Sequence, residues 1–258
     1  MSNDKQKGIL VIAHGSRDSK WMDLIEQSVS LLESNVPVTI GYLELVAGKS
    51  IEDGVRRLED GGAEEILVIP FFVCSGSTHL EEIQYALGVI DHSDLDSHLA
   101  DIHPKAKIIW GKPMDSHPLI IELLADRIRK LSKTPSKESL MLVTHGNNRP
   151  KFQAMWEATL NDMSEKLQAK LGFSEVGIGT ILPDTITESA QALSHDNTKE
   201  IIVAPVFLSE GYYTTKKIPA KLKGLFHAYD GKTYLPHPLI HDWLQEQVND
   251  YCCIEKVY

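Results

Sequence analysis

Short apolar runs alternate along this chain with segments whose apolar residues recur at helical spacing. In the first half the runs are rich in β-branched residues and lie at 9–13, 38–45, 66–73 and 106–110. Such runs are typical of strands buried on both faces of a parallel sheet. Amphipathic segments lie between them, at 21–32, 51–58 and 80–87. The alternation predicts a doubly wound α/β domain.

The same pattern returns in the second half, with strands expected near 140–144, 176–181 and 201–208. GILVIAHGSR at 8–17 is echoed by LMLVTHGNNR at 140–149, and 66–83 align without a gap with 201–218. The sequence HPLI occurs near the end of each half, at 117–120 and 237–240. We therefore predict two tandem copies of one domain, residues 1–132 and 133–258, with the polar, proline-containing segment 132–139 as the linker.

The two copies differ in their polar residues. His79 of the first copy aligns with Thr214 of the second. A duplicated fold keeps its core pattern in both copies, so a polar residue found in one copy only is not required by the fold. The asymmetry predicts that the working site lies in the first half.

Three polar side chains of the first half are expected at one edge of its sheet. His14 follows the first strand, Glu44 ends the second, and His79 follows the third after a glycine-bearing turn. Ligands of open parallel sheets bind beyond the carboxyl ends of the strands. Two imidazoles and a carboxylate suit a borderline divalent cation, and neutral imidazoles also accept protons. Taken singly, each side chain has a simpler explanation as a hydrogen-bonding or solvated group, and Leu182 lies near the position that matches Glu44.

Composition narrows the choice of partner. The formal net charge is −10, which argues against a nucleic-acid partner because phosphate binding needs a basic face. The longest apolar run is too short to span a bilayer and the amino terminus is polar, so we expect a cytoplasmic protein without a membrane partner. The three cysteines lack zinc-site spacing, and no glycine-rich phosphate loop follows the first strand.

The segment 88–106 is a partial exception to the repeat because it carries His92, His98 and His103 among several aspartates. These residues leave two interpretations open, a metal-storage segment or a solvated loop with a short helix. The role of His145, which persists in the second copy, is also left open.

Together these motifs resemble the sirohydrochlorin chelatases in their long, two-domain form. The resemblance is carried by the strand-His-Gly-Ser-Arg start, the Leu-Glu after the second strand, and the segment from Pro70 to Ile83, and it covers about residues 7–245. One departure concerns the mouth of the site, since many relatives have proline where this chain has Gln84.

The resemblance implies a class II chelatase fold, in which two flavodoxin-like domains together form one cleft. We expect the protein to be a monomer. It implies insertion of Co²⁺ or Fe²⁺, with Ni²⁺ also possible, into sirohydrochlorin on the way to cobalamin or sirohaem, with no permanently bound cofactor. The metal ligands would be His14, Glu44 and His79, and the two histidines would also be catalytic. The substrate carboxylates and macrocycle would contact Arg17, Arg149, Lys216 and Tyr212. A non-catalytic metal or tetrapyrrole carrier is the alternative function.

Overall fold

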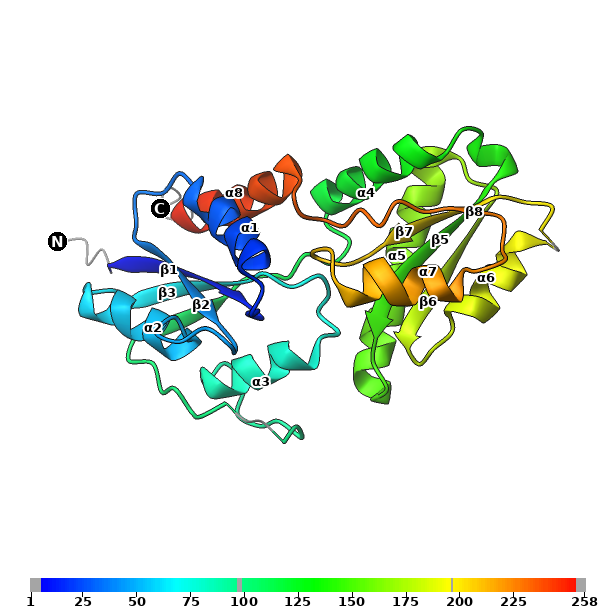
Figure 1. Ribbon diagram of the computed structural model, residues 1–258. Helices are drawn as coiled ribbons and strands as arrows, with labels where there is room; N and C mark the ends of the chain where they lie inside the picture. Colours follow the sequence, from blue (N-terminus) through cyan, green and yellow to red (C-terminus); the bar gives the residue numbers. More distant parts are fainter. Residues whose placement is uncertain (1–5, 97–98, 196, 254–258) are drawn as a thin grey trace. The chain divides into compact units, whose positions relative to one another are not determined.

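Two four-stranded parallel sheets form the framework of the protein. The computed structural model describes residues 6–96, 99–195 and 197–253 (Figure 1). The first sheet has the order β2-β1-β3-β4 and the second the order β6-β5-β7-β8, so the strands follow the same path in both copies. The first set is β1 Lys7–Ala13, β2 Val38–Tyr42, β3 Glu65–Pro70 and β4 Lys107–Trp110. The second set is β5 Ser139–Gly146, β6 Glu175–Leu182, β7 Ile201–Pro205 and β8 His227–Ala228.

Helices follow the strands in both copies, which confirms the predicted doubly wound α/β order. The helices of the first copy are α1 Ser19–Ser30, α2 Ile51–Asp60, α3 Thr78–Ala86 and α4 Pro118–Leu131. The second copy has α5 Pro150–Leu171, α6 Ile186–Ser194, α7 Ile218–Lys221 and α8 Pro238–Cys253, with the π-helical turn η2 Tyr213–Lys217 before α7. A short 3₁₀ turn, η1 Pro135–Lys137, lies in the segment predicted as the linker.

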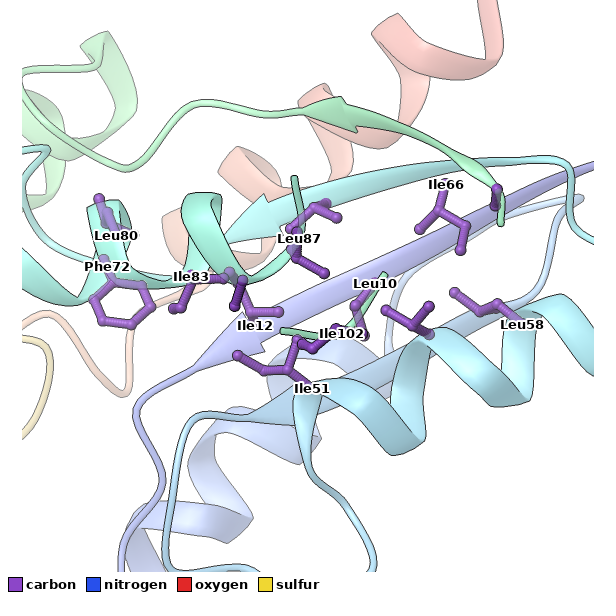
Figure 2. Packing of buried hydrophobic residues seen from close by; sticks show 14 residues of the cluster. Leu10, Ile12, Ile51, Leu58, Ile66, Phe72, Leu80, Ile83, Leu87 and Ile102 are labelled. Carbon is purple, nitrogen blue, oxygen red and sulfur yellow. The ribbon is translucent and has the colours of Figure 1, made fainter. Parts of the chain in front are cut away.

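The first core packs between the sheet and its helices (Figure 2). Leu10 and Ile12 of β1, Ile51 of α2 and Ile83 of α3 are almost fully buried there. Ser50 and Asp53 form a capping box that fixes the start of α2, because each side chain accepts a backbone N–H of the other residue. The core therefore holds the carboxyl end of β1 and the start of α3 on one rigid base.

Three strands end earlier than the apolar pattern indicates, and one of them is β7, which ends at Pro205 and not at Leu208. β2 ends at Tyr42, not at Leu45, because the chain turns there and Leu45 takes a left-handed φ of 66°. β3 ends at Pro70, not at Val73. Phe71 and Phe72, which follow β3, are nonetheless buried, so the apolar run extends past the strand into the core.

The compact units of the fold are not identical with the two sequence repeats. One unit comprises residues 1–114 and 241–258, and the other comprises residues 115–240. Helix α4 of the first repeat packs on α5 and β7, and Arg127 donates hydrogen bonds to the backbone of the second unit at Thr233 and Pro236. Most of α8 belongs to the first unit, where Trp243 packs on Phe71 with ring centroids 5.9 Å apart. The units thus differ from the predicted division at residue 132, because each repeat's last helix packs on the other unit.

No helix in the described ranges is both long and apolar enough to cross a membrane.

Candidate metal-handling site

The site begins at the turn that follows β1. His14 leaves the strand, and Gly15 after it has a φ of +96°. A Cβ atom on Gly15 would lie 2.0 Å from the carbonyl oxygen of Glu44, so only glycine lets the two turns approach this closely. The His14 ring bonds through Nδ1 to the carbonyl oxygen of Gly15, at 3.2 Å.

Glu44 lies in the turn after β2, two residues beyond the strand's end. Its backbone N–H donates to the carbonyl of His14 at 3.1 Å, which fixes the backbone of one turn against the other. Its carboxylate is half exposed and lies 3.6 Å from His14 Nδ1. The carboxylate of Glu44 therefore lies on the Nδ1 side of His14. A group in this position contacts the imidazole ring itself and not an ion bound at Nε2.

His79 is the second residue of α3 and faces the rim because Leu80 and Ile83 take the buried side of the helix. The rings of His14 and His79 meet edge to face, with centroids 4.8 Å apart and an interplanar angle of 79°. His79 Nδ1 lies 3.0 Å from a carboxylate oxygen of Glu82, one turn further along α3. We call His14, Glu44 and His79 the histidine rim.

The hydrogen bonds of the rim indicate which nitrogen of each histidine ring carries the proton. A backbone carbonyl and a carboxylate only accept, so both Nδ1 atoms must carry the proton in these contacts. Each neutral ring then presents Nε2 with its lone pair. Within residues 6–96, 99–195 and 197–253, however, no three His, Cys, Asp or Glu side chains are placed so that they could hold one ion. The structure brings the two histidines together, whereas Glu44 would have to swing to join them.

The second unit repeats the backbone of this rim but not its chemistry. His145 Nδ1 contacts the carbonyl oxygen of Gly146 at 3.1 Å, as His14 contacts that of Gly15. A Cβ on Gly146 would lie 2.1 Å from the carbonyl of Leu182, so Leu182 takes the place of Glu44. The ring that meets His145 edge to face is Tyr213, at 5.4 Å and 88°. Thr214, the counterpart of His79, is buried and bonds to the backbone of Gly211.

The residues predicted to contact substrate lie on the surface of their own units. Arg17 is exposed close behind His14, and Arg149 is exposed directly before α5. Lys216 is exposed in η2, and Tyr212 is 70% exposed with its ring against Tyr213. The sequence analysis assigned no role to Glu82. One sequence difference could have indicated it: Glu82 aligns with Lys217 in the second copy, so the acid is lost together with His79.

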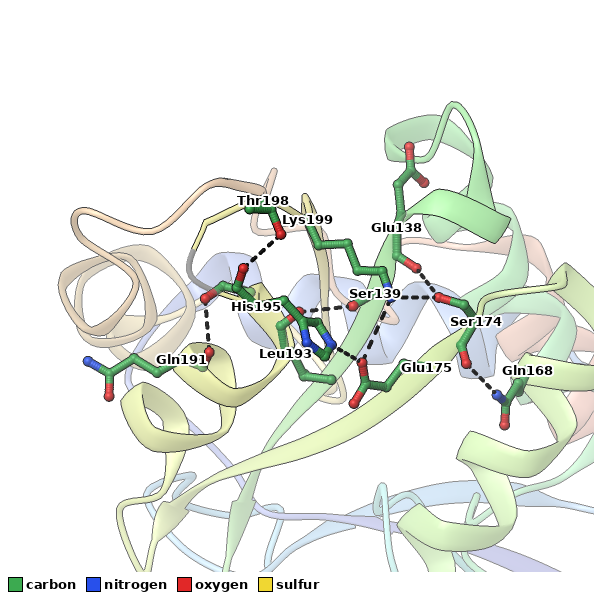
Figure 3. Close-up of polar contacts among 11 residues, drawn as sticks. Glu138, Ser139, Gln168, Ser174, Glu175, Gln191, Leu193, His195, Thr198 and Lys199 are labelled. Carbon is green, nitrogen blue, oxygen red and sulfur yellow. Dashed lines mark hydrogen bonds and ion pairs between the residues drawn. The ribbon is translucent and has the colours of Figure 1, made fainter.

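Two further histidines pair with acidic side chains outside the rim residues. At the amino edge of the second sheet, His195 pairs with Glu175, the first residue of β6, at 2.6 Å (Figure 3). Over the described positions 88–96 and 99–106 there is no helix, and Leu99 and Ile102 pack on the first core. His92 pairs with Asp94 in solvent at 2.9 Å, and His98 lies outside the described residues. The described part of this segment is a loop, without the short helix that one of the two interpretations included.

Two doubly wound sheets, one with a histidine pair at its carboxyl edge, together with the likeness of the whole chain to solved chelatase structures, define a class II chelatase fold. A model of the CbiX family matches residues 8–131 and again residues 139–251. The chain belongs to the CbiX family, and the double match confirms that it contains two copies of one module.

Curated relatives cover one or both copies. The chain is 26% identical to the sirohydrochlorin cobaltochelatase of Sulfolobus acidocaldarius over 124 residues, which are 48% of this chain and 90% of that protein. It is 20% identical to the ferrochelatase of Aliivibrio fischeri over 246 residues, 87% of this chain and 74% of that protein. The first relative is therefore close in length to one repeat, and the second spans both.

Solved structures match the whole fold. A Bacillus subtilis SirB structure with Fe³⁺ superposes with a TM-score of 0.73 at 18% identity, covering 95% of each chain. The sirohydrochlorin chelatase SirB of Bacillus subtilis subspecies spizizenii in complex with cobalt gives a TM-score of 0.68 at 17% identity, covering 95% of this chain and 94% of that one. At these identities the likeness concerns the fold.

Proposed function

We propose that this protein inserts a divalent metal ion, Co²⁺ or Fe²⁺, into sirohydrochlorin. The observation that carries the proposal is the pair of histidines in the first unit, whose Nδ1 atoms are both engaged and whose Nε2 atoms make no hydrogen bond to any residue that the structure describes. The curated cobaltochelatase relatives support the substrate class. The metal is a substrate here and leaves with the product.

Metal insertion makes two demands on the protein. The ion must lose part of its water shell before it reaches the macrocycle, and two pyrrole N–H protons must leave as the metal enters. Imidazole nitrogens meet both demands, because a neutral Nε2 binds a borderline divalent ion and accepts a proton once the ion has moved on. In this proposal His14 and His79 bind the metal and take up the protons.

Glu44 is the third proposed metal ligand. Its carboxylate is 51% exposed, so it can change rotamer without disturbing a buried side chain. In the described rotamer it lies beside His14 Nδ1, and rotation toward Nε2 would complete a set of two imidazoles and one carboxylate. In this proposal the three ligands come together only when the ion is bound. Glu44 can move away again, so the ion can leave for the macrocycle.

The substrate is a polycarboxylate macrocycle, and the exposed cations are its proposed partners. Arg17 and Arg149 can each grip a carboxylate with two parallel hydrogen bonds, and Lys216 offers a point charge. Tyr212 exposes an aromatic face on which a planar ring could stack. Co²⁺ and Fe²⁺ remain the two proposed metals, with Ni²⁺ as a third, because supply and geometry select among them more than ligand type does.

The proposed activity is tested by recording the absorbance spectrum of sirohydrochlorin under anaerobic conditions with the purified protein and each metal in turn. We expect conversion to the metallated spectrum at a rate well above that of a control without protein. A spectrum that shifts on binding but never converts would support the carrier alternative and overturn the proposed catalysis.

A further inference from the structure

His79 has a partner that the metal-binding set does not include. Glu82 lies three residues further along α3, so the two side chains share one face of the helix. Glu82 Oε2 lies 3.0 Å from His79 Nδ1. The carboxylate side chain is only 20% exposed, against 38% for the imidazole, so water competes weakly for this contact.

The contact selects the tautomer of His79. The carboxylate of Glu82 offers no proton, so in the neutral imidazole Nδ1 carries the hydrogen and Nε2 keeps its lone pair. A histidine that binds a metal through one nitrogen commonly donates its other N–H to a carboxylate, which orients the ring and strengthens it as a ligand. Glu82 has the chemistry and the position for this role.

The second copy shows that the fold does not need Glu82. Ile83 and its counterpart Ile218 are both fully buried, so the core face of the segment is the same in both copies. Glu82, however, corresponds to Lys217, whose ammonium group lies 5.7 Å from the centre of the Tyr213 ring. The carboxylate is thus replaced in the copy that has also lost the histidine.

The neighbouring acid, Glu81, contacts a different side chain. Glu81 is 9% exposed and accepts a hydrogen bond from Ser93 at 3.1 Å, which ties α3 to the loop that follows it. Two adjacent carboxylates therefore serve different partners, and Glu81 provides a matched control on the same helical turn.

We propose that Glu82 is a positioning residue that holds His79 with Nε2 free to bind the metal substrate. This inference rests on the proposed function for its purpose, but the hydrogen bond and the tautomer can be measured without any tetrapyrrole.

The test compares the full-length protein with Glu82→Ala, Glu82→Gln and the control Glu81→Gln. The tautomer of His79 is read from ¹⁵N chemical shifts of histidine-labelled protein at a pH where the rings are neutral. We expect a dominant Nδ1–H form in the unmodified protein and in Glu81→Gln. We expect a mixture of tautomers in Glu82→Ala, and a partial shift in Glu82→Gln because an amide can donate as well as accept.

Co²⁺ titration, followed by the visible absorption of the bound ion, provides the second measurement. We expect Glu82→Ala to weaken Co²⁺ binding by about 10- to 100-fold, while Glu81→Gln binds as the unmodified protein does. An unchanged tautomer and unchanged Co²⁺ affinity in Glu82→Ala would overturn the positioning role, as would equal losses in Glu81→Gln. If both readouts change as expected but no insertion into sirohydrochlorin occurs, the positioning role stands and the proposed function fails.

Discussion

In each unit, a single glycine lets the turns after two neighbouring strands approach closely. The carbonyl oxygen of Glu44 occupies the space that a side chain on Gly15 would need. The carbonyl oxygen of Leu182 occupies the equivalent space beside Gly146. Both glycines have positive φ, +96° and +70° respectively. The two glycines are therefore needed for the same backbone reason, although the residues around them have diverged.

This equivalence predicts the effect of adding one methyl group at each position. Gly15→Ala and Gly146→Ala should both lower the stability of their units, by about 2 kcal/mol or more, because the left-handed φ and the clash act together. Only Gly15→Ala should also weaken Co²⁺ binding, because only this turn borders His14 and Glu44. Urea unfolding and Co²⁺ titration of the two variants measure these effects; equal losses of Co²⁺ affinity would contradict the placement of the site.

At the scale of elements, buried polar groups fix the segment between α4 and β5. Glu138 is 5% exposed and accepts N–H bonds from Lys133 and Thr134, both at 2.9 Å, together with a bond from the Ser132 hydroxyl. Burial alone would raise the pKa of Glu138, but these hydrogen bonds outweigh it and hold the pKa below its ordinary value of 4.5. The predicted linker is thus an anchored connection.

The lowered pKa makes this anchor sensitive to acid. A group whose pKa is lower in the folded state stabilises the fold above its unfolded pKa and loses that contribution as the pH falls through the folded value. Glu138→Gln should cost about 1–3 kcal/mol at neutral pH, and the difference from the unmodified protein should shrink below about pH 4. Urea unfolding across this range measures it, and a pH-independent difference would contradict the role of the carboxylate.

The local sequence pattern predicts most strands well, but it predicts poorly where a strand ends and which side chains contact each other. The β-branched runs indicated seven of the eight strands found in the described residues, and the exception, β8, has only the two residues His227 and Ala228. The turn at Leu45 was missed because left-handed backbone is rare for leucine, so nothing in the apolar run indicates where β2 stops. The three-residue spacing of His79 and Glu82 allows their side chains to meet on one face of a helix. The spacing alone does not show that they do, because it does not fix the rotamers.

For the whole molecule, the repeat predicted two sheets, which the structure confirms, whereas the placement of the site in the first copy stays a prediction. The repeat did not predict that α4 would pack on the second unit and α8 on the first. An amphipathic pattern shows that a helix has a face to bury, and it does not show which surface covers that face. The exchange means that each compact unit contains chain from both repeats.

The central claim is that metal chemistry belongs to the first unit although both units carry a histidine at the same turn. His14→Ala and His145→Ala form a matched pair, because each ring bonds the carbonyl of the glycine that follows it. The most direct test is the kcat for metal insertion into sirohydrochlorin by these two variants. We predict that His14→Ala lowers kcat by about 100-fold or more while His145→Ala retains most of it; an equal loss in His145→Ala, or full activity in His14→Ala, would contradict the account.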